Sequence, residues 1–249
     1  MKILVTLGNV PDTTTKARFA DGDTHLDMTG VQWIINPWDE LALTRAMELK
    51  EDAANPVDHV TVVTVGTQEA EPTIRKALAI GADDAIRVNA EAKDAWFTAQ
   101  QIAAAVKDQD FDLILTGIES SDYNGAAVGG MVAELLDLTS ISAVSGVELN
   151  GNEITLHRDI DGGSETVQAD LPLVAIVQKG IAKEPRIPAM RGIMMARKKP
   201  LQVVDPVEAD ALTSYNHFEL PQPKPPCKMI DPEHVEELVS LLQNEAKVI

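Results

Sequence analysis

The chain has 249 residues and a formal net charge of −18, from 21 basic and 39 acidic side chains. This charge repels nucleic acids and anionic membrane surfaces, so we expect small molecules and proteins as partners and no nucleic acid. No stretch approaches the ~18 apolar residues of a membrane helix, and the apolar run after Lys2 is too short for a secretory signal, so we expect no membrane insertion. Cys227 is the only cysteine, which excludes an internal disulfide and favours a cytoplasmic setting.

The first half of the chain alternates predicted strands and helices. Short apolar or β-branched runs predict strands at residues 3–7, 59–65, 85–88 and 112–116. Apolar residues at helical spacing predict helices at residues 38–50, 71–80 and 94–107, the first opened by Asn36-Pro37 and the second ended by Gly81. Strands and helices that alternate with short connections predict a doubly wound α/β fold, with a mostly parallel sheet and helices on both faces.

A glycine-rich segment, GIESSDYNGAAVGG at residues 117–130, lies between a predicted strand and an apolar helix at 131–136. Small residues at such a junction let backbone amides approach a phosphate, at the edge of the sheet where ligands bind in open α/β folds. The segment contains neither a dinucleotide-binding G-x-G-x-x-G motif nor a P-loop. A plain small-residue turn is the alternative, and the composition leaves both interpretations open.

The alternation of predicted strands and helices ends after residue 136. Asn150-Gly151 predicts a hairpin between strands at 147–149 and 153–157, followed by strands at 166–169 and 173–177. We expect one α/β domain over residues 1–205 and a C-terminal arm over residues 206–249, because prolines accumulate after Val204. The arm ends in a helix from Pro232, capped by Asp231, whose amphipathic character requires a surface to dock on. Its apolar stripe consists of Val235, Leu238, Val239 and Leu242.

No group of residues indicates catalytic chemistry. The acids around Gly162-Gly163, which include Asp159, fit a tight turn with solvated carboxylates. The five histidines have no metal-ligand spacing, and Ser120 and Ser121 lack the G-x-S-x-G motif. We therefore expect no catalytic residues, no metal site and no substrate turnover of the chain's own.

Residues 179–200 form a cationic, methionine-rich segment in this acidic chain. Pro185 and Pro188 exclude a regular helix from its first half. Met190, Met194 and Met195 favour an exposed contact loop. The alternative is a solvated basic turn whose methionines fold back into the core, and the loop alone slightly favours it, because most charge runs are solvated surface. The basic residues are Lys183, Arg186, Arg191, Arg197, Lys198 and Lys199.

Six ordered blocks between residue 1 and about residue 205 resemble the β subunit of electron-transfer flavoproteins, and the final NEAKVI is similar to a Bacteroidetes-type branch of that family. The blocks are VPDT at 10–13, INPWDELALTRAMELKE at 35–51, TIRKALAIGADDAIRV at 73–88, DLILTGIESSD at 112–122, RDIDGGSETV at 158–167 and EPRIPAMRGIMMARKKP at 184–200.

The resemblance implies a sheet of the adenine-nucleotide α-hydrolase-like type and a heterodimer. An α subunit would hold most of a redox-active FAD, and the β subunit would bind AMP or a second FAD in its own nucleotide-binding domain, over residues 1–205. The arm would pack on the α subunit. The dimer would carry electrons from acyl-CoA and related dehydrogenases to a membrane quinone oxidoreductase, with the chemistry supplied by the flavin.

The resemblance also transfers site residues by position. A recognition loop at residues 183–199 would insert Met190 into a dehydrogenase pocket as an interface hot spot, surrounded by Pro188, Arg191, Ile193, Met194 and Met195. Thr13 and Asp159 would lie near the flavin. The nucleotide contacts would be Thr6, Asn36, Pro37, Trp38, Asp39, Val65, Gly117, Ile118, Glu119, Ser120, Ser121, Asp122, Tyr123, Asn124, Gly125, Ala126, Ala127 and Val128.

Three departures from the family pattern affect these expectations. Glu119 replaces a frequent glutamine, and residues 122–128 read DYNGAAV where relatives have a D-G-D-T-x-Q-V type loop. Met195 replaces a frequent lysine, so the dehydrogenase partner can differ. The altered loop leaves open an assembly subunit with a vacant nucleotide site. A stand-alone adenine-nucleotide-binding module of the universal-stress type is a further alternative, because it shares the sheet architecture.

Overall fold

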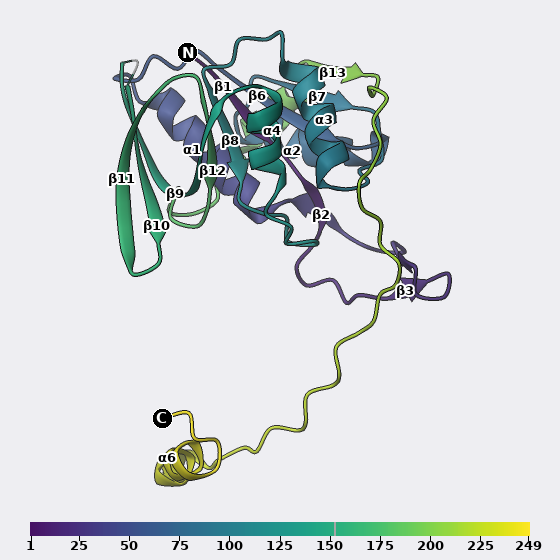
Figure 1. Cartoon of the computed structure of the whole chain (residues 1–249), viewed down its shortest axis with the longest axis vertical. Coiled ribbons are helices and arrows are strands. Elements are labelled where there is room, and N and C mark those ends of the chain that lie inside the picture. The colour runs from purple at the N-terminus through teal and green to yellow at the C-terminus, as the bar shows by residue number, and fades with distance from the viewer. Residues whose placement is uncertain (152) are drawn as a thin grey trace.

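A computed structural model describes residues 1–151 and 153–249 as an α/β domain with a long C-terminal arm (Figure 1). Its main sheet has nine strands in the order β11-β10-β9-β12-β8-β1-β6-β7-β13. All neighbouring pairs from β9 to β13 are parallel, whereas β10 pairs antiparallel with both β9 and β11. The strands are β1 (Lys2–Thr6), β6 (His59–Val65), β7 (Asp84–Val88), β8 (Leu113–Gly117), β9 (Thr139–Asn150), β10 (Glu153–Ile160), β11 (Gly163–Asp170), β12 (Leu173–Val177) and β13 (Leu201–Val204).

Helices cover both faces of the sheet, so the predicted doubly wound fold is confirmed. One core lies under α1 and α2, where Leu43 and Leu78 pack with Ile3 and Val5 of β1. The second core lies under α3 and α4, around Leu4 of β1. Successive residues of β1 thus point into opposite cores, as the alternation of a strand requires. The helices are α1 (Pro37–Glu51), α2 (Glu71–Ile80), α3 (Ala95–Val106), α4 (Val128–Leu135), α5 (Met190–Ala196) and α6 (Val235–Asn244).

Several features differ from the sequence-based expectations. Strand β9 begins at Thr139, eight residues before the predicted strand at 147, and α4 begins three residues before the predicted 131. Strand β13 was not predicted; it extends the sheet by pairing in parallel with β7. A short helix, α5, occupies the second half of the methionine-rich loop, whereas the half that contains Pro185 and Pro188 is not helical, as predicted.

Smaller elements lie outside the main sheet. Two-stranded pairs join β2 (Asn9–Pro11) to β5 (Trp33–Ile35) and β3 (Phe19–Ala20) to β4 (His25–Leu26). Short 3-10 turns, η1 (Gln68–Ala70) and η2 (Pro232–His234), precede α2 and α6.

The direction of the chain through the sheet reverses beside β1. The strands that follow β1 build outward through β6 and β7, and the chain then returns to add β8 on the other side of β1. The chain therefore continues from the carboxyl ends of β1 and β8 to helices on opposite faces of the sheet, α1 and α4. Open α/β sheets bind ligands at such a point, and we call this junction the crevice.

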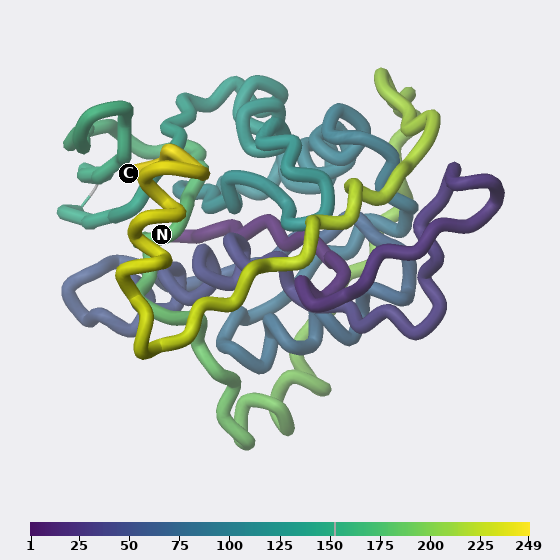
Figure 2. The backbone as a smooth tube through the Cα atoms, turned by 90° about the horizontal axis from the view of Figure 1, so that it is seen from below, coloured from purple at the N-terminus to yellow at the C-terminus, as the bar shows by residue number. Residues whose placement is uncertain are grey.

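The C-terminal arm first follows the domain and then leaves it. Figures 1 and 2 show it running from β13 past α3 and β3 before it extends to α6. None of the ten residues of α6 is buried, and Figure 1 shows the helix standing apart from the sheet. Across the described residues, the helices are all too short or too polar to cross a membrane.

Candidate functional site

A buried carboxylate closes the crevice between β1 and β8. Asp39, in the first turn of α1, is only 6% exposed. Its Oδ2 accepts a hydrogen bond from the amide of Gly8, just after β1, at 2.7 Å, and its Oδ1 accepts one from the amide of Gly117, at the end of β8, at 2.9 Å. Both strand ends and the start of α1 are thus fixed to one side chain.

Burial raises the pKa of Asp39 to about 6, because desolvation penalises the carboxylate, and nearby Asp122 acts in the same direction. The hydrogen bonds from Gly8, Asn36 and Gly117 lower the pKa and only partly offset the desolvation. At neutral pH Asp39 is therefore ionised and serves as an acceptor for the two amides.

The side chain of Asn36 holds the loop after β8 against α1. It is 1% exposed, its Nδ2 donates to the carbonyl of Glu119 at 2.8 Å, and its Oδ1 accepts from the amide of Ser121 at 3.1 Å. The backbone amide of Asn36 also donates to the carbonyl of Gly8 at 2.9 Å. Asn36 therefore positions the beginning of the 117–128 loop, which we call the site loop.

The middle of the site loop has an unusual backbone. Asn124 and Ala126 have φ angles of 50° and 48°, in the left-handed region that costs an alanine free energy. Helix α4 follows at Val128, and its first amides have no acceptor within the helix. A Cβ added at Gly125 or Gly130 would meet no atom within 4 Å, so the backbone is open to a ligand there. Backbone amides at a helix N-terminus form a suitable cradle for an anionic group.

Most of the residues transferred by position come together at this crevice. Thr6 ends β1 and Val65 ends β6, on the same edge of the sheet as the site loop. The amide of Ile118 donates to the carbonyl of Val177 at 2.8 Å, which ties the loop to β12 as well. Residues 117–130 contain two acids and no basic residue, so an anion at this position would depend on backbone amides.

Thr13 and Asp159 lie in other parts of the molecule. Asp159, on β10, accepts hydrogen bonds from Gln178 Nε2 at 2.5 Å and from the hydroxyl of Ser145 at 3.3 Å. Thr13 is exposed in a turn in which Asp12 accepts a bond from the amide of Thr14 at 2.8 Å. In the described part of the chain, neither residue makes a hydrogen bond to the site loop.

Sequence reasoning did not identify the role of Gly8 or the contribution of the arm. Gly8 directly follows the strand predicted at residues 3–7, and this position was the available signal, because backbone amides after parallel strands face the ligand-binding end of the sheet. Tyr215 of the arm stacks on Tyr123 of the site loop, and no local pattern in a proline-rich segment indicates such a contact.

The methionine-rich loop is held at both ends. Arg186 makes an ion pair with Glu51 at 2.7 Å, and its amide donates to the hydroxyl of Thr44 at 3.0 Å. At the other end, Lys199 Nζ donates to the carbonyls of Leu78 and Gly81 at 3.0 Å each, and also to that of Ala82. These bonds satisfy free carbonyls at the C-terminal end of α2.

Between these attachments the apolar side chains are exposed. Ile187 is 87% exposed, Met190 77%, Met194 72% and Met195 51%. The interpretation in which the methionines fold back into the core, which the loop alone slightly favoured, is therefore wrong. The loop presents an apolar surface, and exposed apolar patches of this kind are typical of contact sites.

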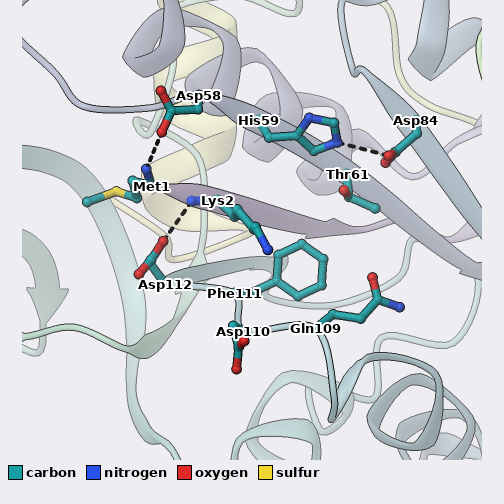
Figure 3. A pocket seen from close by; sticks show the side chains of 10 residues that line it. All are labelled: Met1, Lys2, Asp58, His59, Thr61, Asp84, Gln109, Asp110, Phe111 and Asp112. Carbon is teal, nitrogen blue, oxygen red and sulfur yellow. Dashed lines mark hydrogen bonds and ion pairs between the residues drawn. The ribbon is translucent and has the colours of Figure 1, made fainter.

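A cavity of about 530 Å³ lies at the other end of the strands, beside the amino ends of β1 and β6 (Figure 3). Its ionic groups are largely paired with one another. The N-terminal ammonium contacts Asp58 at 2.7 Å, and His59 Nε2 contacts Asp84 Oδ2 at 2.8 Å. Within the described ranges, no cluster of three or more His, Cys, Asp or Glu is arranged to hold a metal ion. The cavity is remote from the site loop and shares no residue with it.

Comparisons with known proteins agree with this architecture. A family model described as "Electron transfer flavoprotein domain" matches residues 23–209. The chain is 39% identical to the electron transfer flavoprotein subunit beta of Bacillus subtilis (strain 168), over 100% of both chains. It is 34% identical to the protein of the same name from Syntrophomonas wolfei, over 90% of this chain and 87% of that one. It is 30% identical to the mitochondrial electron transfer flavoprotein subunit beta of Oryza sativa subsp. japonica, over 100% of both.

Proposed function

Since this chain belongs to the electron transfer flavoprotein family as a β subunit, we propose that it forms half of a heterodimeric electron carrier that takes electrons from dehydrogenases and passes them to a quinone oxidoreductase. Acyl-CoA dehydrogenases are the expected donors, which would connect the carrier to fatty acid β-oxidation. The lone Cys227 favours the cytoplasm as its location. The chain itself would turn over no substrate.

The observation that carries the proposal is the crevice at the ends of β1 and β8, where Asp39 and Asn36 fix the site loop. The open backbone at Gly125 and Gly130 and the unsatisfied amides at the start of α4 fit a phosphate group. We propose that this crevice holds the phosphate of AMP or of a second FAD. Glu119 and Asp122 would then face solvent or the ribose, because a carboxylate repels phosphate.

A redox-active FAD held mainly by the α subunit would supply one- and two-electron transfer when bound. In this chain, Thr13 and Asp159 are the residues proposed to border it. Gln178 Nε2 and the Ser145 hydroxyl already orient the Asp159 carboxylate, so its direction does not depend on a cofactor.

We propose that the arm, residues 206–249, completes the attachment to the α subunit. Val235 is 55% exposed, Leu238 44% and Val239 42%, so the apolar stripe of α6 is uncovered. An isolated helix of this length is marginal in water and gains stability only from a surface that covers its apolar face. The extended segment before α6 allows that surface to belong to another chain.

The proposal can be tested by co-expressing the chain with a candidate α subunit and purifying the chain by a tag on its N-terminus. We expect a yellow 1:1 complex that releases FAD, together with AMP or a second equivalent of FAD, when it is denatured. Release of one FAD and no other nucleotide would contradict the nucleotide site and leave an assembly role. A colourless homodimer that binds ATP tightly would instead support the stand-alone nucleotide-binding module.

A further inference from the structure

The C-terminal arm is fastened to the domain along α3, at Gln101 in the middle of the helix and at its N-cap Asp94, before it leaves. Gln101, 1% exposed, exchanges two hydrogen bonds with Val207, from its Nε2 to the carbonyl at 2.9 Å and from the Val207 amide to its Oε1 at 2.8 Å. Asp94 Oδ2 accepts from the amides of Leu212 at 2.7 Å and Thr213 at 2.9 Å. These hydrogen bonds fix the path of the arm at Val207, Leu212 and Thr213.

From this attachment the arm reaches the site loop through a row of four stacked rings. The ring of Tyr215 lies 4.8 Å from that of Tyr123, with an interplanar angle of 21°, and 5.5 Å from that of Phe218. Phe218 stacks in turn on Phe19 of β3 at 5.6 Å, and its amide donates to the carbonyl of Asp23 at 2.8 Å. The aromatic row of Tyr123, Tyr215, Phe218 and Phe19 joins the site loop, the arm and the β3–β4 hairpin.

Near Tyr123, the amide of Asn124 donates to the carbonyl of Ser120 at 2.9 Å, and the site loop has few other restraints there. Asn36 fixes its beginning through Glu119 and Ser121, and α4 fixes its end. The residues between them are small or exposed, and two of them have left-handed backbones that a free loop would tend to leave. The stack between Tyr123 and Tyr215 supplies a side-chain restraint in this middle part, and stacked aromatic pairs contribute more than their buried area alone.

We propose that Tyr215 is a positioning residue for the nucleotide site, which holds the site loop in its ligand-ready conformation by stacking on Tyr123. This inference rests on the nucleotide site proposed above. The same arm continues to α6. The segment that would attach to the partner through α6 is therefore also the segment that holds the site loop through Tyr215. By linkage, whatever stabilises the arm on the domain raises nucleotide affinity, and bound nucleotide in turn stabilises the arm.

The test compares Tyr215→Ala, Tyr215→Phe and the control His217→Ala in the purified heterodimer. His217 is exposed, lies in the same arm and is outside the aromatic row. Backbone amide hydrogen exchange in residues 120–127 reports loop opening without any need for activity. We expect Tyr215→Ala to raise this exchange and the dissociation rate of bound nucleotide by roughly 2- to 10-fold, the range of a stacked aromatic pair. Tyr215→Phe and His217→Ala should match the wild type.

A double-mutant cycle with Tyr123→Ala gives a second measurement. If the two rings act through each other, the double variant should open no faster than either single variant, whereas independent effects would multiply. Unchanged exchange in Tyr215→Ala, or fully multiplicative effects in the cycle, would overturn the inference. If no preparation contains a second nucleotide, the proposed nucleotide site fails, and the exchange data still decide whether Tyr215 positions the loop.

Discussion

Asp39 Oδ1 lies 2.9 Å from the amide nitrogen of Gly117, and this single hydrogen bond joins the first turn of α1 to the end of β8. The residue opposite the carboxylate must be a glycine. A Cβ built on Gly117 would overlap Asp39 Oδ1 and would lie 2.9 Å from Trp38 Cβ. The relationship between these two residues leads to two predictions.

Gly117→Ala should push the site loop away from α1. We expect a loss of about 1–3 kcal/mol in the free energy of unfolding, the usual cost of overpacking, and a loss of bound nucleotide. Urea denaturation and nucleotide release from the heterodimer measure the two effects. Gly130→Ala is the matched control for stability, because its Cβ would meet no atom within 4 Å. Equal stability of the two variants would contradict the proposed steric conflict.

Asp39 should make the protein more stable as the pH falls toward 4. The folded-state pKa of about 6 lies above the unfolded value of 3.8, so the folded state binds a proton more tightly and gains stability below the folded pKa. Relative to Asp39→Asn, which does not titrate, the wild type should lose about 2 kcal/mol between about pH 4.5 and pH 7. Parallel stability curves for the two proteins would show that Asp39 does not carry this raised pKa.

Lys199 should stabilise the domain, whereas its neighbour Lys198 should not. Lys199→Met leaves the carbonyls of Leu78, Gly81 and Ala82 without their common donor, which we expect to cost about 1–3 kcal/mol. Lys198→Met removes an exposed charge and should change the thermal midpoint very little. Thermal unfolding of the two variants decides the matter, and equal midpoints would refute the assignment.

Met190→Ala should slow electron transfer from the donor dehydrogenase without altering cofactor content. A hot-spot residue of this kind contributes about 2 kcal/mol or more, so kcat/KM for the donor should fall roughly 30-fold. Met190 is 77% exposed, so folding should be unaffected. Met28→Ala, at a methionine that is 49% exposed and outside the recognition loop, is the control. Unchanged kinetics with every donor that reduces the wild type would exclude an anchoring role.

Leu238→Glu should weaken the heterodimer by placing a charge in the apolar stripe of α6. The α/β domain should remain folded, since none of the ten residues of α6 is buried in it. Gln243→Glu, at an exposed polar position of the same helix, controls for the added negative charge. Sedimentation of the two complexes at decreasing concentration measures the effect, and identical dissociation would place α6 outside the interface.

The sequence was sufficient to predict the sheet and its helices where local pattern and tertiary role agree. The β-branched run at residues 59–65 and the helix opened by Asn36-Pro37 are examples, and both were confirmed. The prediction for strand β9 was too short because Ser140, Ser142 and Ser145 interrupt its apolar pattern. Its pairing with β12 and β10 nevertheless makes this whole segment a strand. Strand β13 has four residues and depends on the adjacent β7, so no local signal could identify it.

The candidate site was less accessible to sequence reasoning. The resemblance selected Asn36, Asp39 and the site loop, and the structure brings these residues together. The roles of the two side chains depend on where β8 is inserted beside β1, which is a property of the whole sheet. Lys198 and Lys199 are identical neighbours in the sequence, and only the location of the C-terminal end of α2 distinguishes a solvated lysine from a bound one.

The proline-rich stretch between the domain and α6 gives the arm the properties of a tether. Pro221, Pro223, Pro225 and Pro226 favour an extended chain, and at about 3.1 Å per residue the segment 219–231 can reach roughly 40 Å. If α6 docks on an α subunit as proposed, the tether would keep the two subunits within reach of each other after they separate, at an effective concentration of about millimolar. Reassembly would then be an intramolecular step, so the heterodimer would be able to open for a redox partner and close again without losing its companion chain.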